Sequence, residues 1–189
     1  MTRVAIGQDS HRFMRQSAAA GAARAAGTTT GAVNSAAESA GTAGERPLLL
    51  GGVRFDGAPP LEGNSDADVV LHALTNAISG ITGVNVLGET ADRMCRELGI
   101  TDSAAYVREA MGSLGANRIV HLSFSIECAR PPISRKIRAM RESIARITGV
   151  APDSIGITAT SGEGLTAFGR GRGIQVFCVV TCETIDGAK

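Results

Sequence analysis

The chain has 189 residues, of which 43% are hydrophobic and 20% are charged, and its formal net charge is +1. These values are typical of a globular protein with one core, and they exclude a global electrostatic attraction to nucleic acid or to an anionic membrane. The sequence lacks the ~18 unbroken apolar residues of a membrane span and the apolar core of a signal peptide. Its four cysteines form no CxxC pair, which predicts free thiols in a reducing, cytoplasmic setting.

The first predicted strand ends in IGQDSHRF (residues 6–13). Residues two apart on a strand point to the same face, so Asp9 and His11 form a pair of potential metal ligands. A surface pair and a buried salt bridge are alternatives that the spacing alone leaves open. After this strand, 24 of the 28 residues in 17–44 are Ala, Gly, Ser or Thr. This composition predicts a flexible surface insertion at about residues 15–45, inside one domain that spans 1–189.

The next elements alternate between strand and helix. RPLLLGGVRF (residues 46–55) predicts strand, turn and strand, and SDADVVLHALTNAISGI (residues 65–81) predicts a helix capped by Ser65 or Asp66. TDSAAYVREAMGSLG (residues 101–115) predicts a second helix, capped by Asp102.

The second half of the chain continues this pattern. RIVHLSFSIEC (residues 118–128) predicts a strand whose buried side holds Val120, Leu122, Phe124, Ile126 and Cys128. A third helix begins after two prolines and ends at Gly149, and two closing strands follow. This order predicts an α+β fold, a single-domain α/β sandwich with one mainly four-stranded sheet and helices packed on one face.

Two of the three histidines are candidates for chemistry. His72 shares a helix face with Asp68, and together with Asp9 and His11 it would complete a set of three ligands with one open position, as in catalytic zinc sites. Asp68 has two possible roles. Its carboxylate either accepts a hydrogen bond from the ring N–H of a metal-binding histidine, or it is an acidic group in the first turn that the helix dipole favours. His121 has no acidic partner nearby in sequence and is expected at the surface.

A second cluster lies in ATSGEGLTAFGRGRG (residues 159–173), which is rich in glycine and contains two arginines and Glu163. Glycines let backbone N–H groups approach an anion, arginine binds phosphate in a bidentate manner, and a carboxylate beside phosphates suits Mg²⁺. A glycine-rich hairpin with a solvated charge is the alternative.

Four stretches resemble the 2-C-methyl-D-erythritol 2,4-cyclodiphosphate synthase family, in the family's order: GQDSHRF, RPLLLGGVRF, NSDADVVLHAL and ATSGEGLTAFGRGRG. The resemblance implies a homotrimer with active sites at subunit interfaces, zinc on Asp9, His11 and His72, and magnesium or manganese on Glu163. It implies a cytidine diphospho-substrate, 4-diphosphocytidyl-2-C-methyl-D-erythritol 2-phosphate, whose own 2-phosphate displaces CMP. It also implies that Asn64 and Ser161 stabilise the transition state. The positions expected to bind substrate are Asp9, Ser10, His11, Asn64, Ser65, Gly88, Arg130, Pro131, Pro132, Ile133, Thr160, Ser161, Gly162, Glu163 and Arg170.

The sequence departs from the family mainly at positions that are expected to contact the nucleotide part of the substrate. Asn64 stands where the family usually has His, and Gly164 stands where it has Lys. The segment Arg130–Ile133 replaces the family's Ala-Pro-Lys-Met, and VNVLGETADRM (residues 84–94) retains only Gly88 of the ribose-contacting segment. These departures motivate two alternatives: a trimeric metal- or ligand-binding relative without cyclase activity, and a zinc-dependent hydrolase of another phosphate ester.

Overall fold

The structure is a computed structural model that describes residues 1–14 and 46–185. The predicted insertion at about residues 15–45 lies outside these ranges. No helix in the described part of the chain is both long and apolar enough to cross a membrane.

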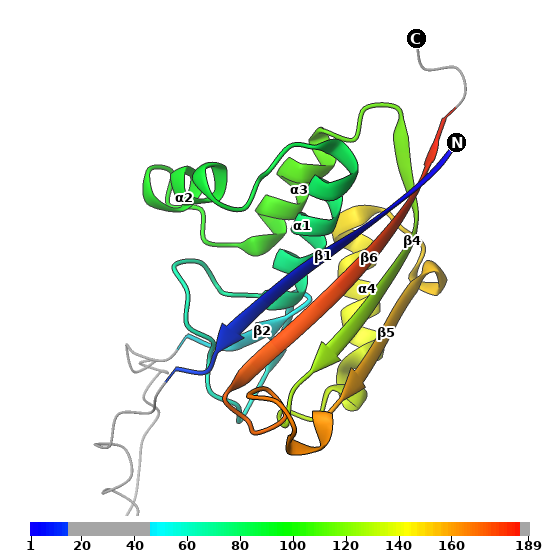
Figure 1. Ribbon diagram of the computed structural model, residues 1–189. Coiled ribbons are helices and arrows are strands. Elements are labelled where there is room, and N and C mark those ends of the chain that lie inside the picture. The colour runs from blue at the N-terminus through cyan, green and yellow to red at the C-terminus, as the bar shows by residue number, and fades with distance from the viewer. Residues whose placement is uncertain (15–45, 186–189) are drawn as a thin grey trace, which may run out of the picture.

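A four-stranded sheet forms one layer of the molecule (Figure 1). Its strands are β1 (Thr2–Arg12), β4 (Asn117–Glu127), β5 (Ile155–Thr160) and β6 (Gly173–Thr184), in the order β1-β6-β4-β5. β4 and β5 are parallel, because helix α4 (Ile137–Thr148) carries the chain back between them, whereas the other pairs are antiparallel. The expected four-stranded sheet is confirmed.

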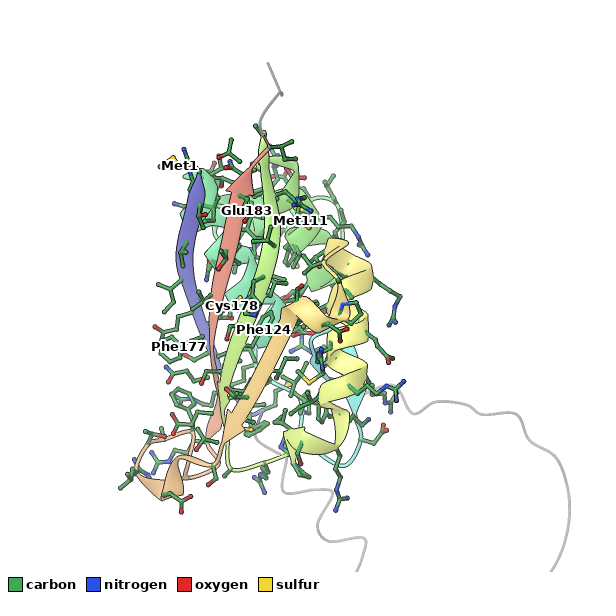
Figure 2. The ribbon with its side chains drawn as sticks, turned by 90° about the vertical axis from the view of Figure 1, so that its right-hand side faces the viewer. Met1, Met111, Phe124, Phe177, Cys178 and Glu183 are labelled. Carbon is green, nitrogen blue, oxygen red and sulfur yellow. The ribbon has the colours of Figure 1, made fainter. Side chains whose placement is uncertain are left out.

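Helices cover one face of this sheet, as predicted (Figure 1). α1 (Val69–Thr82) packs on β1 and β6, α4 packs on β5, and α3 (Ser103–Gly112) packs beside α1. The core lies between the two layers, where alternate residues of β6 from Ile174 to Cys182 are fully buried. The opposite face has no helix layer (Figure 2), and Val4 and Ile6 of β1 and Phe177 of β6 are exposed there.

Helix α1 begins later than the sequence indicated. The predicted caps Ser65 and Asp66 are wrong, because Asp68 is the N-cap and accepts hydrogen bonds from the backbone N–H groups of Val70 and Leu71. Ala67 has a φ of 56°, and this left-handed residue turns the chain just before the helix. Asp102 caps α3 as predicted, and Gly149 ends α4 in the left-handed conformation.

The alternation in β4 contains one irregularity. A β-bulge between Ile119 and His121 shifts the register, so that Ile119 is buried and Val120 only half-buried. The predicted inward position of Val120 is therefore wrong, while Leu122, Phe124, Ile126 and Cys128 are buried as expected. His121 is exposed, in agreement with its prediction as a surface residue.

Smaller elements complete the fold. β2 (Leu48–Leu50) and β3 (Val53–Phe55) form the predicted hairpin, and a 3₁₀ turn, Ile133–Lys136, leads into α4. Helix α2 (Glu89–Arg96) was not predicted, because only Ala91 and Met94 of its eight residues are buried and they leave little apolar periodicity. The four cysteines are free thiols, as expected.

Candidate functional site

Strand β1 presents two ligand side chains to helix α1. From Ala5 to His11, its odd-numbered residues face the helix layer and its even-numbered residues face outward. Gly7 lies against α1, where a Cβ would stand 2.3 Å from the Ala73 carbonyl oxygen and 2.2 Å from the Ala77 nitrogen. This close approach, which only glycine permits, brings Asp9 and His11 within reach of α1.

His72 of α1 completes a group of three donors with Asp9 and His11. Asp9 Oδ2 lies 2.9 Å from His11 Nε2 and 3.0 Å from His72 Nδ1, and the two ring nitrogens are 3.2 Å apart. Ligand atoms at ~2.0–2.1 Å from a tetrahedral zinc ion are separated by about 3.3 Å. The three donors are therefore spaced for one small cation, and their two-nitrogen, one-oxygen chemistry suits zinc. The geometry favours the metal interpretation over a surface pair.

The pKa values of Asp9 and His11 are shifted because the three side chains lie so close together. Burial by itself would raise the pKa of Asp9, but the hydrogen bonds and charges of His11 and His72 outweigh it and hold that pKa well below its usual range. Burial would lower the pKa of His11, but the hydrogen bond and charge of Asp9 outweigh it and raise that pKa. The carboxylate thus attracts a positive charge, either a proton on imidazole or a metal ion in its place.

The Asp68 carboxylate does not hydrogen-bond a histidine ring. Its two carboxylate oxygens accept hydrogen bonds from the backbone N–H groups of Gly51, Gly52, Val70 and Leu71. It therefore caps α1 and anchors the β2–β3 turn to this helix. The acceptor nearest His72 Nε2 is instead the Ser103 hydroxyl, at 2.9 Å, with the Ser65 hydroxyl at 3.3 Å.

The segment that carries Asn64 and Ser65 is held by an arginine that the sequence did not single out. The Arg46 guanidinium donates to the carbonyl oxygens of Leu61 at 2.5 Å, Gly63 at 2.9 Å and Ser65. Ser65 is buried beside His72, whereas Asn64 is exposed. Ser65 therefore contacts the cluster through His72.

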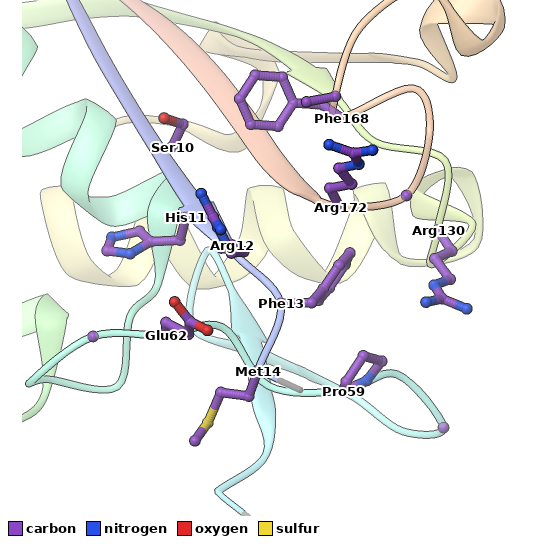
Figure 3. A pocket seen from close by; sticks show the side chains of 14 residues that line it. Ser10, His11, Arg12, Phe13, Met14, Pro59, Glu62, Arg130, Phe168 and Arg172 are labelled. Carbon is purple, nitrogen blue, oxygen red and sulfur yellow. The ribbon is translucent and has the colours of Figure 1, made fainter. Parts of the chain in front are cut away.

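An open pocket of about 1200 Å³ adjoins the cluster (Figure 3). It contains the predicted residues Ser10, His11 and Arg130, together with residues that were not predicted. The latter include the basic residues Arg12 and Arg172 and the aromatic residues Phe13 and Phe168. The Arg130 guanidinium lies 5.8 Å from the centre of the Phe13 ring, in the range of a cation–π contact.

The glycine-rich segment forms a separate turn between β5 and β6. Glu163 is exposed and adopts a φ of 48°, and the Ser161 hydroxyl lies 3.3 Å from its carboxylate. Thr160 Oγ1 accepts a hydrogen bond from the Gly162 N–H. Arg170 donates to the carbonyl oxygens of Gly164 and Leu165, so it stabilises this turn, while Arg172 of the same motif lines the pocket.

The remaining predicted positions are distributed over the surface and the core. Gly88 is the N-cap of α2 and has a φ of 116°. Pro131 and Pro132 precede the 3₁₀ turn, whereas the Ile133 side chain is buried in the core. Within one described chain, the pocket lining includes His11 and Arg130 but not Thr160, Ser161, Gly162 or Glu163.

Sequence reasoning missed Ser103, Arg46 and Arg172, the first two for a common reason. Ser103 is 31 residues from His72, Arg46 is 15 or more from the carbonyls that it contacts, and neither pair lies in a recognisable local motif. Only Arg172 carried a signal, because it belongs to the same Gly-Arg-Gly-Arg-Gly run as Arg170.

The fold and the site define a class: an α+β protein with a four-stranded sheet and a group of two histidines and one carboxylate, suited to a cation, beside a basic pocket. The chain belongs to the YgbB family, which it matches over residues 2–183. Curated relatives from Chlamydia muridarum and Chlamydia caviae are 44% and 43% identical over 180 residues. These alignments cover 95% of this chain and 86% and 88% of the relatives, and both relatives are named 2-C-methyl-D-erythritol 2,4-cyclodiphosphate synthase.

Solved structures share this fold. A 2C-methyl-D-erythritol-2,4-cyclodiphosphate synthase in a CDP-bound form superimposes with a TM-score of 0.71 at 25% identity, over 96% of this chain and 100% of that one. The bifunctional IspDF from Campylobacter jejuni gives a TM-score of 0.74 at 24% identity, over 98% of this chain and 43% of that chain. The family resemblance drawn from the four sequence stretches is confirmed.

Proposed function

We propose that this protein converts 4-diphosphocytidyl-2-C-methyl-D-erythritol 2-phosphate into 2-C-methyl-D-erythritol 2,4-cyclodiphosphate and CMP. The observation that carries the proposal is the convergence of Asp9, His11 and His72 within 3.2 Å in a member of the YgbB family. Four free thiols also fit the reducing cytoplasm in which we propose that the reaction takes place.

The reaction is an intramolecular phosphoryl transfer. An oxygen of the substrate's 2-phosphate forms a bond to the β-phosphorus, the bond from that phosphorus to the α-phosphate oxygen breaks, and CMP leaves with the electron pair. The nucleophile is already part of the substrate, so no serine or cysteine nucleophile is required. Holding the two reacting groups in line can contribute about 7–11 kcal/mol to the barrier reduction.

The protein's own residues would hold the ions and the phosphates. Asp9, His11 and His72 would bind zinc, which when bound supplies Lewis-acid polarisation of a phosphate oxygen at its open position. Glu163 would hold magnesium or manganese between the phosphates. Asn64 and Ser161 would donate hydrogen bonds to the oxygens that gain charge in the transition state, and Ser65 would contact a phosphate.

We propose that basic side chains of the pocket compensate for two cationic positions that this sequence lacks. Asn64 and Gly164 stand where the family usually has His and Lys, and both replacements remove positive charge. Arg12, Arg130 and Arg172 line the pocket next to His11. Guanidinium groups bind phosphate in a bidentate manner, so these arginines support binding of a multiply charged phosphate substrate.

We further propose that the active form is a homotrimer with its sites between subunits. On the face of the sheet without helices, Val4, Ile6 and Phe177 are 63%, 64% and 36% exposed. Apolar side chains on a sheet face favour burial against another surface. A neighbouring subunit could also supply the Ser161 and Glu163 turn, which is not part of the pocket lining within one chain.

A product assay tests the function. The purified protein is incubated with the cytidine diphospho-substrate, zinc and magnesium, and the products are followed by ³¹P NMR. We expect CMP and the cyclic diphosphate in equal amounts. Linear hydrolysis products would instead identify a phosphate-ester hydrolase, and bound zinc without turnover would identify a ligand-binding relative.

A further inference from the structure

The second ring nitrogen of His72 contacts a buried hydroxyl. Its Nδ1 faces Asp9 and His11, and its Nε2 lies 2.9 Å from Ser103 Oγ. Ser103 is the first residue of α3 and is fully buried. The ring of Tyr106, also from α3, lies 6.1 Å from the His72 ring, centre to centre. Helix α3 therefore both supports the imidazole and hydrogen-bonds it.

The same hydroxyl contacts Asp66, in the segment just before α1. Ser103 Oγ hydrogen-bonds Asp66 Oδ1, and the Ser103 N–H donates to Asp66 Oδ2 at 3.1 Å. The Asp68 N–H also donates to Asp66 Oδ1, at 3.0 Å. Asp66 thus accepts from two backbone N–H groups as well as from the hydroxyl, and this holds its carboxylate in one orientation.

The hydrogen bonds determine where each proton lies. A carboxylate only accepts, and a serine hydroxyl has one hydrogen, so that hydrogen points to Asp66. The oxygen lone pairs of Ser103 then face Nε2, which must carry a hydrogen itself. When a metal takes the place of the hydrogen that Nδ1 donates to Asp9, Nε2 keeps its own hydrogen and the ring is neutral. This tautomer is the one that can bind a metal through Nδ1.

We propose that Asp66 and Ser103 are positioning residues, which hold His72 in the orientation and tautomer required for metal binding. The role rests on the metal site of the proposed function, although neither residue touches substrate. Mutation of a residue that hydrogen-bonds the second ring nitrogen of a metal-bound histidine typically changes metal affinity by about 10–100-fold. The sequence alone pointed to Asp68 for this role, but the four backbone N–H groups that bind its carboxylate leave it no contact with the ring.

Zinc affinity tests the proposal without substrate. Ser103→Ala removes the hydroxyl but keeps the backbone N–H that binds Asp66, so the start of α3 retains its anchor. The full-length protein is freed of metal, and zinc is titrated against a competing chelator. We expect about 10–100-fold weaker binding and an altered visible spectrum of the Co²⁺-loaded protein. Wild-type affinity together with an unchanged spectrum would overturn the proposal.

Two further variants separate positioning from general stability. Ser79→Ala removes another buried hydroxyl, one on α1 that has no hydrogen-bond partner in the described part of the chain, and should leave zinc affinity unchanged. Asp66→Asn preserves shape but removes the charge that orients the Ser103 hydroxyl, and should weaken zinc binding severalfold or more. Wild-type affinity in Asp66→Asn would contradict the proposed role of Asp66.

A direct measurement of the tautomer needs no variant. In ¹⁵N-histidine-labelled, zinc-loaded protein at pH 8, long-range ¹H–¹⁵N spectra show which ring nitrogen carries hydrogen and which binds zinc. We expect hydrogen on Nε2 and zinc on Nδ1 of His72, and the reverse arrangement would overturn the proposal. The zinc-affinity and NMR measurements are independent of the product assay. Weaker zinc binding in Ser103→Ala would support the positioning role even in a protein that failed to release CMP.

Discussion

At the scale of single residues, the site depends on three side chains whose charges complement one another. Asp9 lies within hydrogen-bond distance of both imidazoles, which hold its pKa below the usual range although burial opposes this. The carboxylate is therefore ionised at neutral pH and can share one cation with the two rings. Removal of any member leaves too few donors for a stable zinc site.

His72→Ala tests the assignment of the ligands. We expect zinc retained after dialysis to fall from about one ion per chain to nearly none, because two donors remain of three. His121→Ala is the matched control, since His121 is exposed on β4 and should not affect zinc content. Metal analysis of the purified proteins gives the answer, and a His72→Ala protein that retains stoichiometric zinc would refute the assignment.

The cysteines offer a second prediction at this scale. Cys128, Cys178 and Cys182 are buried, and burial raises the pKa of each thiol, that of Cys128 to about 11. Against an ordinary thiol pKa of 9.0, a value of about 11 lowers the thiolate fraction of Cys128 at pH 8 about a hundredfold. Iodoacetamide should therefore modify only Cys95 in the folded protein and all four cysteines after unfolding. Peptide mass spectrometry measures this, and rapid labelling of Cys178 in the native state would contradict it.

At the scale of elements, the distance between β1 and α1 is decisive. β1 carries Asp9 and His11, α1 carries His72, and Gly7 lies where the two backbones touch. The ordinary alternation of a strand directs both ligands to one face, but it does not determine how near the helix comes. The absent side chain of Gly7 permits the approach.

Gly7→Ala should separate these two elements. The added Cβ would overlap backbone atoms of Ala73 and Ala77, and backbone cannot rotate away, so we expect a loss of about 3 kcal/mol in the free energy of unfolding. Zinc affinity should fall as well, because His72 moves with α1. Chemical denaturation and zinc titration measure both effects.

Gly112→Ala serves as the control for this change. Gly112 lies in α3, and a Cβ there would meet no atom within 4 Å. We expect it to be neutral or to stabilise the protein by about 0.5–1 kcal/mol, since alanine is the better helix former. Equal stability of the two variants would mean that β1 and α1 are not in close contact at Gly7.

At the scale of the whole molecule, the sheet has one covered and one uncovered face. Helices bury the first and leave the second uncovered (Figure 2). On the second face, Val4, Ile6 and Phe177 form an exposed apolar area. A subunit on that face would remove this area from water and favour association. The homotrimer that we propose makes use of this face.

Ile6→Glu should weaken the trimer. We expect light scattering after size-exclusion chromatography to give three chains for the wild type and smaller species for the variant, because a buried unpaired charge is costly. Leu98→Glu is the matched control, since Leu98 is 64% exposed, like Ile6, but lies between α2 and α3 and not in the sheet. A wild-type protein that elutes as a monomer at all concentrations would refute this assembly.

Local patterns account for much of what the sequence predicted correctly. Asp102 caps α3 because a cap needs only a carboxylate and the N–H groups that follow it. The cap of α1 was assigned to the wrong residue because Ser65, Asp66 and Asp68 are all competent caps by type. The choice of Asp68 depends on Gly51 and Gly52, whose N–H groups bind it from a distant hairpin. Val120 was misplaced because a bulge leaves no trace in the alternation of residue types.

The sequence by itself determined the strands, the helices other than α2, the family and the three metal-binding candidates, since each depends on residues a few positions apart or on motifs of known order. Only the tertiary structure decided that Asp9, His11 and His72 converge within 3.2 Å, that Ser103 and Asp66 stand behind the ring, and that Arg172 rather than Arg170 lines the pocket. The reason is physical. Convergence depends on the close packing of a strand on a helix and on contacts between residues 31 to 63 positions apart, and no local pattern records them.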